Sequence, residues 1–153
     1  MDAVDRRIIR VLQRDGRITN QDLSEEVGLS PSPCLRRVRL LEEAGVIEGY
    51  AAMIDQVRYG LPVNVFVSVR LTRQNDEEIG QFENAILGWE EVMECFLMTG
   101  TRDYLMRVVV ADLEGYERFL KTRLTRLACV ASVESNFAMG VIKRSRALPV
   151  VER

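Results

Sequence analysis

Every second residue from Val63 to Leu71 is valine or leucine, and this spacing restricts what the second half of the chain can form. The residues between them include Asn64, Ser68 and Arg70, which are polar. A strand places successive side chains on opposite faces, whereas a helix repeats about every 3.6 residues. The segment is therefore predicted to be a half-buried strand of a sheet.

The segments after this strand alternate between the helical and the strand period. Asn75 begins a capping box, after which apolar residues recur at helical spacing as far as Trp89. Residues 93–99 and 104–111 have the strand pattern, and Asp112 caps a second helix. A final strand places a set of mostly apolar residues on one face: Val133, Ser135, Phe137, Met139 and Val141.

The order strand–helix–strand–strand–helix–strand is that of a ferredoxin-like domain, which we assign to residues 63–143. Both helices of such a domain cover one face of an antiparallel sheet and leave the other face uncovered. Several residues of the alternating sets that would form this uncovered face are apolar, so a second copy of the sheet is the simplest cover. We therefore expect at least a homodimer.

Three short helices are predicted ahead of this domain. The first carries apolar residues at helical spacing and ends at Gly16. Thr19 begins the second through a capping pattern, and Gly28 terminates it. Ser30 can cap the third helix, which is predicted to continue to about Ala44.

The third helix has one apolar and one basic side. Cys34, Val38 and Leu41 fall on one side of a helical wheel, and no acidic residue occurs between Ser30 and Leu41. A short helix, a tight glycine turn and a second helix with exposed arginines are typical of a DNA-binding helix-turn-helix. Ser32 and Arg36 are the candidates for base contacts, and Arg37 and Arg39 for phosphate contacts. The alternative is a three-helix bundle with a solvated arginine face.

The residues after the third helix complete the predicted domain organisation. Alternation over Val46–Ile54 predicts a strand or short hairpin, the wing of a winged helix, so that the DNA-binding domain spans residues 1–54. Residues 55–62 contain a glycine and a proline and are predicted to be a linker. Residues 144–153 form a C-terminal tail. The expected fold class is α+β.

Composition excludes several functions. The chain has no histidine, which rules out histidine-based triads and HExxH zinc sites, and its net charge is −2. Cys34, Cys95 and Cys129 contain no CxxC pair, which excludes a disulfide framework or thiolate zinc site and suits a reducing cytosol. No apolar run approaches the ~18 residues of a membrane span. We expect a cytoplasmic protein without a membrane partner.

Taken in order, the motifs resemble those of the leucine-responsive/asparagine (Lrp/AsnC) family of transcription regulators. The resemblance covers about Val4 to Lys143. It is carried by four stretches: Asp5-Arg6-Arg7-Ile8-Ile9 with Asp15-Gly16-Arg17; Val27-Gly28-Leu29-Ser30-Pro31-Ser32-Pro33-Cys34-Leu35-Arg36-Arg37-Val38; Gly45-Val46-Ile47-Glu48-Gly49-Tyr50; and Gly100-Thr101-Arg102-Asp103-Tyr104-Leu105 with Glu134-Ser135-Asn136-Phe137.

The resemblance implies a winged-helix DNA reader joined to a sensor (RAM-type) domain. Members of this family dimerise through the sensor sheets, commonly assemble into octamers, and bind an amino acid near a Gly-x-x-Asp turn. That turn corresponds to Gly100 and Asp103, with residues 132–135 of the last strand facing it. Val133 departs from the hydroxyl residue that the family often carries there, and Cys129 replaces the usual glycine before the last strand.

The residues near the turn suggest how an amino acid could bind. Asp103 can accept from its ammonium group, or it can instead bond to the turn backbone. Backbone N–H groups of the turn, together with Thr99, Thr101 and Ser135, can complete the site. A small or apolar ligand side chain is expected, because no charged partner is found among Val133, Ser135, Met98 and Thr99. Met98, Tyr104 and Phe137 are predicted to be core residues.

The predicted function is that of a sequence-specific DNA-binding transcriptional regulator responding to a small amino acid. It is not expected to be an enzyme and needs no cofactor beyond that effector. Its partners are double-stranded DNA, the amino acid, and further copies of itself in a dimer and higher oligomer up to an octamer. The alternative is an architectural DNA-binding protein that responds to no small molecule.

Overall fold

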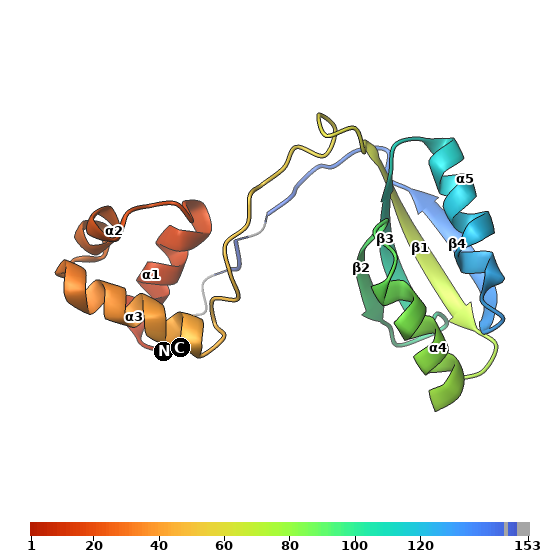
Figure 1. Ribbon diagram of the computed structural model, residues 1–153, viewed down its shortest axis with the longest axis horizontal. Helices are drawn as coiled ribbons and strands as arrows, with labels where there is room; N and C mark the ends of the chain where they lie inside the picture. Colours follow the sequence, from red (N-terminus) through yellow and green to blue (C-terminus); the bar gives the residue numbers. More distant parts are fainter. Residues whose placement is uncertain (146, 150–153) are drawn as a thin grey trace. The chain divides into compact units, whose positions relative to one another are not determined.

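The structure, a computed structural model, describes residues 1–145 and 147–149. The chain divides into two compact units. One comprises Met1–Met53 with the described residues from Ile142 onward, and the other comprises Ile54–Val141 (Figure 1). Each unit has a hydrophobic core of its own. The part of the predicted tail at residues 146 and 150–153 lies outside the described residues.

The first unit contains the three predicted helices, α1 (Ala3–Arg14), α2 (Asn20–Val27) and α3 (Pro31–Glu43). Asp2 caps α1 in a capping box with Asp5, and the Thr19 side chain accepts from the backbone N–H of Asp22 at the start of α2. Gly28 ends α2 in the left-handed conformation, with φ of 72°. The helices enclose a small core: Ile8, Val11, Leu23, Val27, Cys34 and Leu41.

The wing predicted at Val46–Ile54 is not formed as a strand or hairpin in the described chain. Only Ile47 within this segment packs against the helical core, while Tyr50, Met53 and Ile54 are exposed. A strand is stable only when a neighbour pairs with its backbone N–H and C=O groups. The alternating pattern was therefore not sufficient to predict strand structure here.

The second unit is an antiparallel sheet with two helices, as predicted. Its elements in chain order are β1 (Val63–Leu71), α4 (Asp76–Leu87), β2 (Val92–Leu97), β3 (Tyr104–Val110), α5 (Leu113–Thr122), a 3₁₀ turn (Leu124–Arg126) and β4 (Val130–Phe137). The strands lie in the order β2-β3-β1-β4, and all pairs are antiparallel. Asn75 and Asp112 cap the two helices. The predicted ferredoxin-like fold is confirmed.

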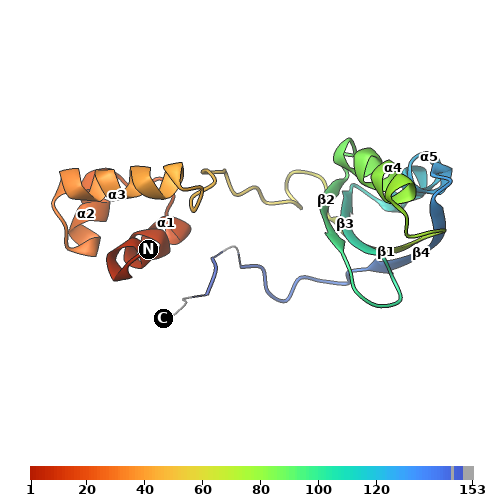
Figure 2. The same ribbon diagram turned by 90° about the horizontal axis from the view of Figure 1, so that it is seen from below.

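Both helices lie on the same face of the sheet (Figure 2). Val65, Val67 and Val69 of β1 are fully buried beneath them. The opposite face, which we call the open face, carries the intervening residues of each strand. It includes Phe66, which is 40% exposed, and Phe96, which is 54% exposed. The uncovered sheet face predicted from the topology is thus present in the chain.

The linker predicted at residues 55–62 contains a hydrogen-bonded turn. The backbone N–H of Tyr59 donates to the carbonyl of Asp55 at 2.9 Å, and that of Leu61 to the carbonyl of Gln56 at 3.0 Å. In the first unit, the backbone N–H of Leu148 donates to the side chain of Gln13 on α1 at 2.6 Å. None of the helices described is long and apolar enough to cross a membrane.

Candidate functional sites

Helix α3 presents three of its four predicted DNA contacts to solvent. Ser32, Arg36 and Arg39 are exposed, whereas Cys34 and Leu41 are buried against α1 and α2. This confirms the predicted division of the helix into an apolar and a basic side. An arginine side chain on an exposed helix face can donate two parallel hydrogen bonds to a base edge or a phosphate.

The turn between α2 and α3 fixes the direction of α3. The Asn20 side chain donates to the carbonyl of Pro31 at 2.9 Å, and the backbone N–H of Leu29 donates to the carbonyl of Ser24 at 2.8 Å. The first bond ties the start of α3 to α2, and the second closes the turn at the end of α2. The exposed arginines are therefore carried on a helix with a defined orientation within its unit.

Arg37, the fourth candidate, pairs with the acidic start of α1. Its Nη1 donates to Asp2 at 2.8 Å and to Asp5 at 2.7 Å. A backbone hydrogen bond from Asp5 and the Arg37 guanidinium together lower the pKa of Asp2 from 3.8 to about 2. The sequence showed both aspartates as helix-capping residues but gave no indication that Arg37 reaches them across 32 to 35 positions.

The second candidate site surrounds the turn between β2 and β3. Gly100 has φ of 111°, a value that side-chain-bearing residues rarely adopt. The turn is closed by a hydrogen bond from the backbone N–H of Met98 to the carbonyl of Asp103, at 2.8 Å. Thr99, Thr101 and Gly100 all lie in this turn, as predicted.

Asp103 holds the turn against the end of β1. Its Oδ2 accepts from the backbone N–H of Leu71 at 2.7 Å, and its Oδ1 from the Gln74 side chain at 2.6 Å. The side chain is buried, and its backbone N–H donates to the carbonyl of Val69. Both carboxylate oxygens thus have partners within the chain. The structure supports the backbone-bonding role, and contact with a ligand stays a prediction.

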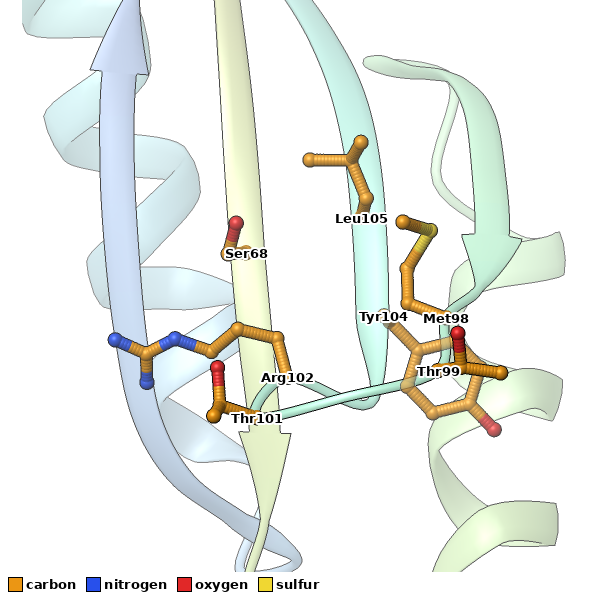
Figure 3. A pocket seen from close by; sticks show the side chains of 7 residues that line it. All are labelled: Ser68, Met98, Thr99, Thr101, Arg102, Tyr104 and Leu105. Atoms are coloured by element: carbon orange, nitrogen blue, oxygen red, sulfur yellow. The ribbon is translucent and has the colours of Figure 1, made fainter.

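A hollow of about 200 Å³ adjoins this turn. We call it the open-face hollow (Figure 3). Met98 is exposed at its wall, so the prediction of a core position for Met98 was wrong: the residue lies beyond the end of β2. Phe137, at the end of β4, is also exposed and not a core residue, whereas Tyr104 is buried as predicted. The lining residues are Ser68, Met98, Thr99, Thr101, Arg102, Tyr104 and Leu105.

Val133 and Ser135 lie on the other face of the sheet from this hollow. Val133 pairs with Val69 and packs against the core, and the Ser135 hydroxyl is hydrogen-bonded to that of Tyr116 on α5. The structure therefore does not bring these two residues together with Thr99 and Thr101 within one chain. The reason is the alternation of the strand, which gives the open face to the intervening residues Ser132 and Glu134.

Arg102 was absent from the predicted site but borders it. Its Nη1 donates to the Ser132 hydroxyl at 2.9 Å and its Nη2 to Glu134 at 2.8 Å. The hydrogen bond from Arg102, together with one from Asn136, lowers the pKa of Glu134. In the sequence, the only indication of a role for Arg102 is its position between Gly100 and Asp103. This position does not show towards which face of the sheet the side chain points.

None of the three thiols is activated. Burial raises the pKa of Cys34, of Cys129 and of Cys95, the last to about 11. A redox-reactive cysteine has a lowered pKa, so these shifts are opposite to those of a redox-reactive thiol. The part of the chain that the structure describes contains no cluster of metal-ligating side chains.

Two protein-family models match the chain. Residues 64–148 match the Lrp/AsnC ligand binding domain, and residues 1–48 match a winged helix-turn-helix DNA-binding domain. The Bkd operon transcriptional regulator of Pseudomonas aeruginosa is 44% identical over 150 residues, which cover 98% of each chain. The leucine-responsive regulatory protein of Escherichia coli is 40% identical over 153 residues, all of this chain and 93% of that one.

A solved structure is also similar over nearly the whole length. It is a complex of a transcriptional regulator from Neisseria meningitidis with L-Met, with a TM-score of 0.93 and 37% sequence identity. The match covers 97% of this chain and 96% of that chain. The similarity to this structure in fold and in sequence extends over both units. It therefore includes the exposed helix α3 and the sheet with its β2–β3 turn.

Proposed function

Because this chain belongs to the Lrp/AsnC family of DNA-binding transcriptional regulators and is not an enzyme, we propose that an amino acid binds its C-terminal unit and controls DNA binding through α3. The observation that carries this proposal is the presence, in one chain, of a helix with exposed arginines and a small hollow beside the Gly100 turn. Its place of action would be the cytoplasm, where the DNA lies.

Four residues of α3 are the proposed DNA contacts. Ser32 and Arg36 would meet base edges, and Arg37 and Arg39 would meet phosphates. Arg37 uses only Nη1 for its two aspartates among the described residues, so Nη2 and Nε can still donate to a phosphate. Arg37 would then join the start of α1, the third helix and the DNA backbone.

The proposed assembly is a homodimer through the open face, with further association of dimers up to an octamer. Phe66 and Phe96 are large apolar side chains whose exposure on this face supports the proposal. A dimer presents two copies of α3, so the preferred operator should be a rough palindrome. Its half-sites would be separated by about one helical turn, ~34–36 Å, or a multiple of it.

The proposed effector site is the open-face hollow and the turn beside it. Thr99, Gly100 and Thr101 would contribute hydroxyls and backbone N–H groups, and Asp103 would hold the turn in place. Val133 and Ser135 lie on the other face of the sheet, so they could contribute to the site only from a second copy of the chain. The hollow is smaller than the roughly 300–1,000 Å³ of pockets for drug-sized ligands, which suits a ligand of amino-acid size.

The test is a thermal-shift screen of the purified chain against the twenty L-amino acids. A ligand at a hundredfold excess over its Kd should stabilise the folded chain by about 2.7 kcal/mol. The same amino acid should change the affinity of the chain for its operator, measured by fluorescence anisotropy at fixed salt concentration. If none of the twenty changes either quantity, the chain is not an amino-acid-responsive regulator.

One observation favours a second candidate, an architectural DNA-binding protein without an effector. Both oxygens of Asp103 already have partners within the chain, and Val133 and Ser135 face the helices. Such a protein would bind and bend DNA to the same extent with or without any amino acid. Bending measured by the mobility of circularly permuted DNA fragments, unchanged by all twenty amino acids, would favour it.

A further inference from the structure

The side chain of Arg102 spans the open face. It leaves the β2–β3 turn, crosses over β1 and ends beside β4 (Figure 3). There its guanidinium donates to Ser132 at 2.9 Å and to Glu134 at 2.8 Å. Because β4 is an edge strand of the sheet, this one side chain connects the turn to the edge.

The start of this side chain is held firmly. The neighbouring Asp103 is bonded through its backbone to Val69 and through its carboxylate to Leu71 and Gln74. The far end is held less firmly in the single chain, where Arg102 is 35% and Glu134 55% exposed, because an exposed ion pair contributes little to stability. The guanidinium can therefore exchange its partner without disturbing the turn.

The open-face hollow is lined mainly by uncharged residues. Among its seven lining residues, only Arg102 is charged at neutral pH. Ser68, Thr99 and Thr101 contribute hydroxyl groups, and Met98 and Leu105 contribute apolar surface. This combination suits a small molecule with a carboxylate at one end and an apolar group at the other.

We propose that Arg102 binds the carboxylate of the ligand, and that the Glu134 carboxylate occupies this arginine until the ligand displaces it. The inference rests on the proposed function, which it deepens by naming the group that holds the effector and the group that competes with it. Met98 and Leu105 then face the apolar part of the ligand. The ligand class is an aliphatic amino acid with a free carboxylate.

The exchange replaces one carboxylate on the guanidinium by another. Glu134 is a carboxylate at neutral pH, and the hydrogen bond from Arg102 lowers its pKa further, so the competing group is charged. The ligand also contacts Met98 and Leu105 with its apolar part, a contact that Glu134 does not make, and this added burial favours the exchange. Displacement of Glu134 also removes one of the two side-chain bonds that connect the turn to β4 across the open face.

Isothermal titration of the full-length chain tests the proposal. Each of the twenty L-amino acids that stabilises the parent is titrated into the parent, Arg102→Gln and Glu134→Gln. We expect Arg102→Gln to raise the Kd about tenfold to a hundredfold, the loss typical of a charged hydrogen bond. Glu134→Gln should lower the Kd several-fold, because the competing carboxylate is gone. The C-terminal amide of the same amino acid should not bind the parent.

The control is Arg70→Gln. Arg70 is an exposed arginine of the open face, on β1 opposite Ser132, and it does not line the hollow. Its replacement should leave the Kd unchanged. An equal loss in Arg70→Gln and Arg102→Gln would show that the charge of the face, and not Arg102, attracts the ligand. Weaker binding by Glu134→Gln would show that Glu134 contacts the ligand, and would overturn the competition.

The failure of the inference differs from that of the proposed function. If an amino acid stabilises the parent and Arg102→Gln binds it equally well, the regulator function stands and the role of Arg102 is wrong. If no amino acid binds the parent, the proposed function fails, and the inference fails with it. The replaced side chains are partly exposed, so each variant should fold. Melting curves recorded without ligand check this.

Discussion

Among single residues, the contacts of Asp2 with Arg37 and with the Asp5 backbone should make the stability of the fold depend on pH. The pKa of Asp2 is lowered from 3.8 to about 2 in the folded chain, so its charge stabilises the fold above about pH 4. This stabilisation is lost as the pH falls from about 4 towards 2. Asp2→Asn keeps a good N-cap but removes the charge. Its melting temperature should be below that of the parent at pH 6 and should approach it near pH 2. A pH-independent difference would contradict this assignment.

Arg36 and Arg37 lie side by side in the sequence but should differ in DNA binding. Arg36→Ala should cost about 1–3 kcal/mol at a preferred operator and relax the choice of sequence, because a base contact is lost. Arg37→Ala should weaken binding to all sequences alike and reduce the salt dependence, because a phosphate contact is lost. Fluorescence anisotropy with specific and random duplexes over a range of salt concentrations measures both. The assignment of α3 is wrong if both variants bind as the parent does.

At the scale of elements, the β2–β3 turn depends on Asp103. Asp103→Ala removes the acceptor of the Leu71 backbone N–H and of the Gln74 side chain. Losing such partners in a buried position should destabilise the second unit by about 1–3 kcal/mol, which urea unfolding can measure. Thr101→Ala in the same turn, at an exposed position, should change the free energy of unfolding little. Equal stability of Asp103→Ala and the parent would mean that the turn is held by other contacts.

The stability of this turn also determines how an effector experiment with Asp103 is interpreted. A loss of ligand binding in Asp103→Ala can follow from a displaced turn as well as from a lost contact. Arg102 is the better probe, because its side chain is partly exposed and its partners Ser132 and Glu134 lie on another strand. In the β2–β3 turn, Asp103 thus positions the backbone, and Arg102 is available to contact a ligand.

At the scale of the whole molecule, the open face of the sheet should mediate dimerisation. A fragment that begins at Pro62 retains the core and the open face, so light scattering should give twice its chain mass. In the full chain, Phe66→Arg should shift the equilibrium towards monomer, because a charge would be buried in the interface. Leu87→Arg is the matched control, since Leu87 is 86% exposed on α4, away from the open face. A monomeric fragment would disprove this interface.

The sequence alone determined the elements and the fold class because their signals are local. Thr19, Asn75 and Asp112 cap helices through bonds to backbone groups three residues later, and the alternation of β1 is present within nine residues. The order of these elements then restricts the topology. The basic side of α3 also followed from its period, since residues that share a helix face are three or four positions apart.

Only the tertiary structure decided which candidate side chains meet. Arg37 with Asp5, Asp103 with Leu71, and Arg102 with Ser132 are pairs separated by 30 to 32 positions. Such contacts depend on strand register and helix packing, and a shift of one residue moves a side chain to the other face of a sheet. For this reason Val133 and Ser135 were expected beside the turn but lie beneath the sheet, while Arg102 and Glu134 meet on the open face.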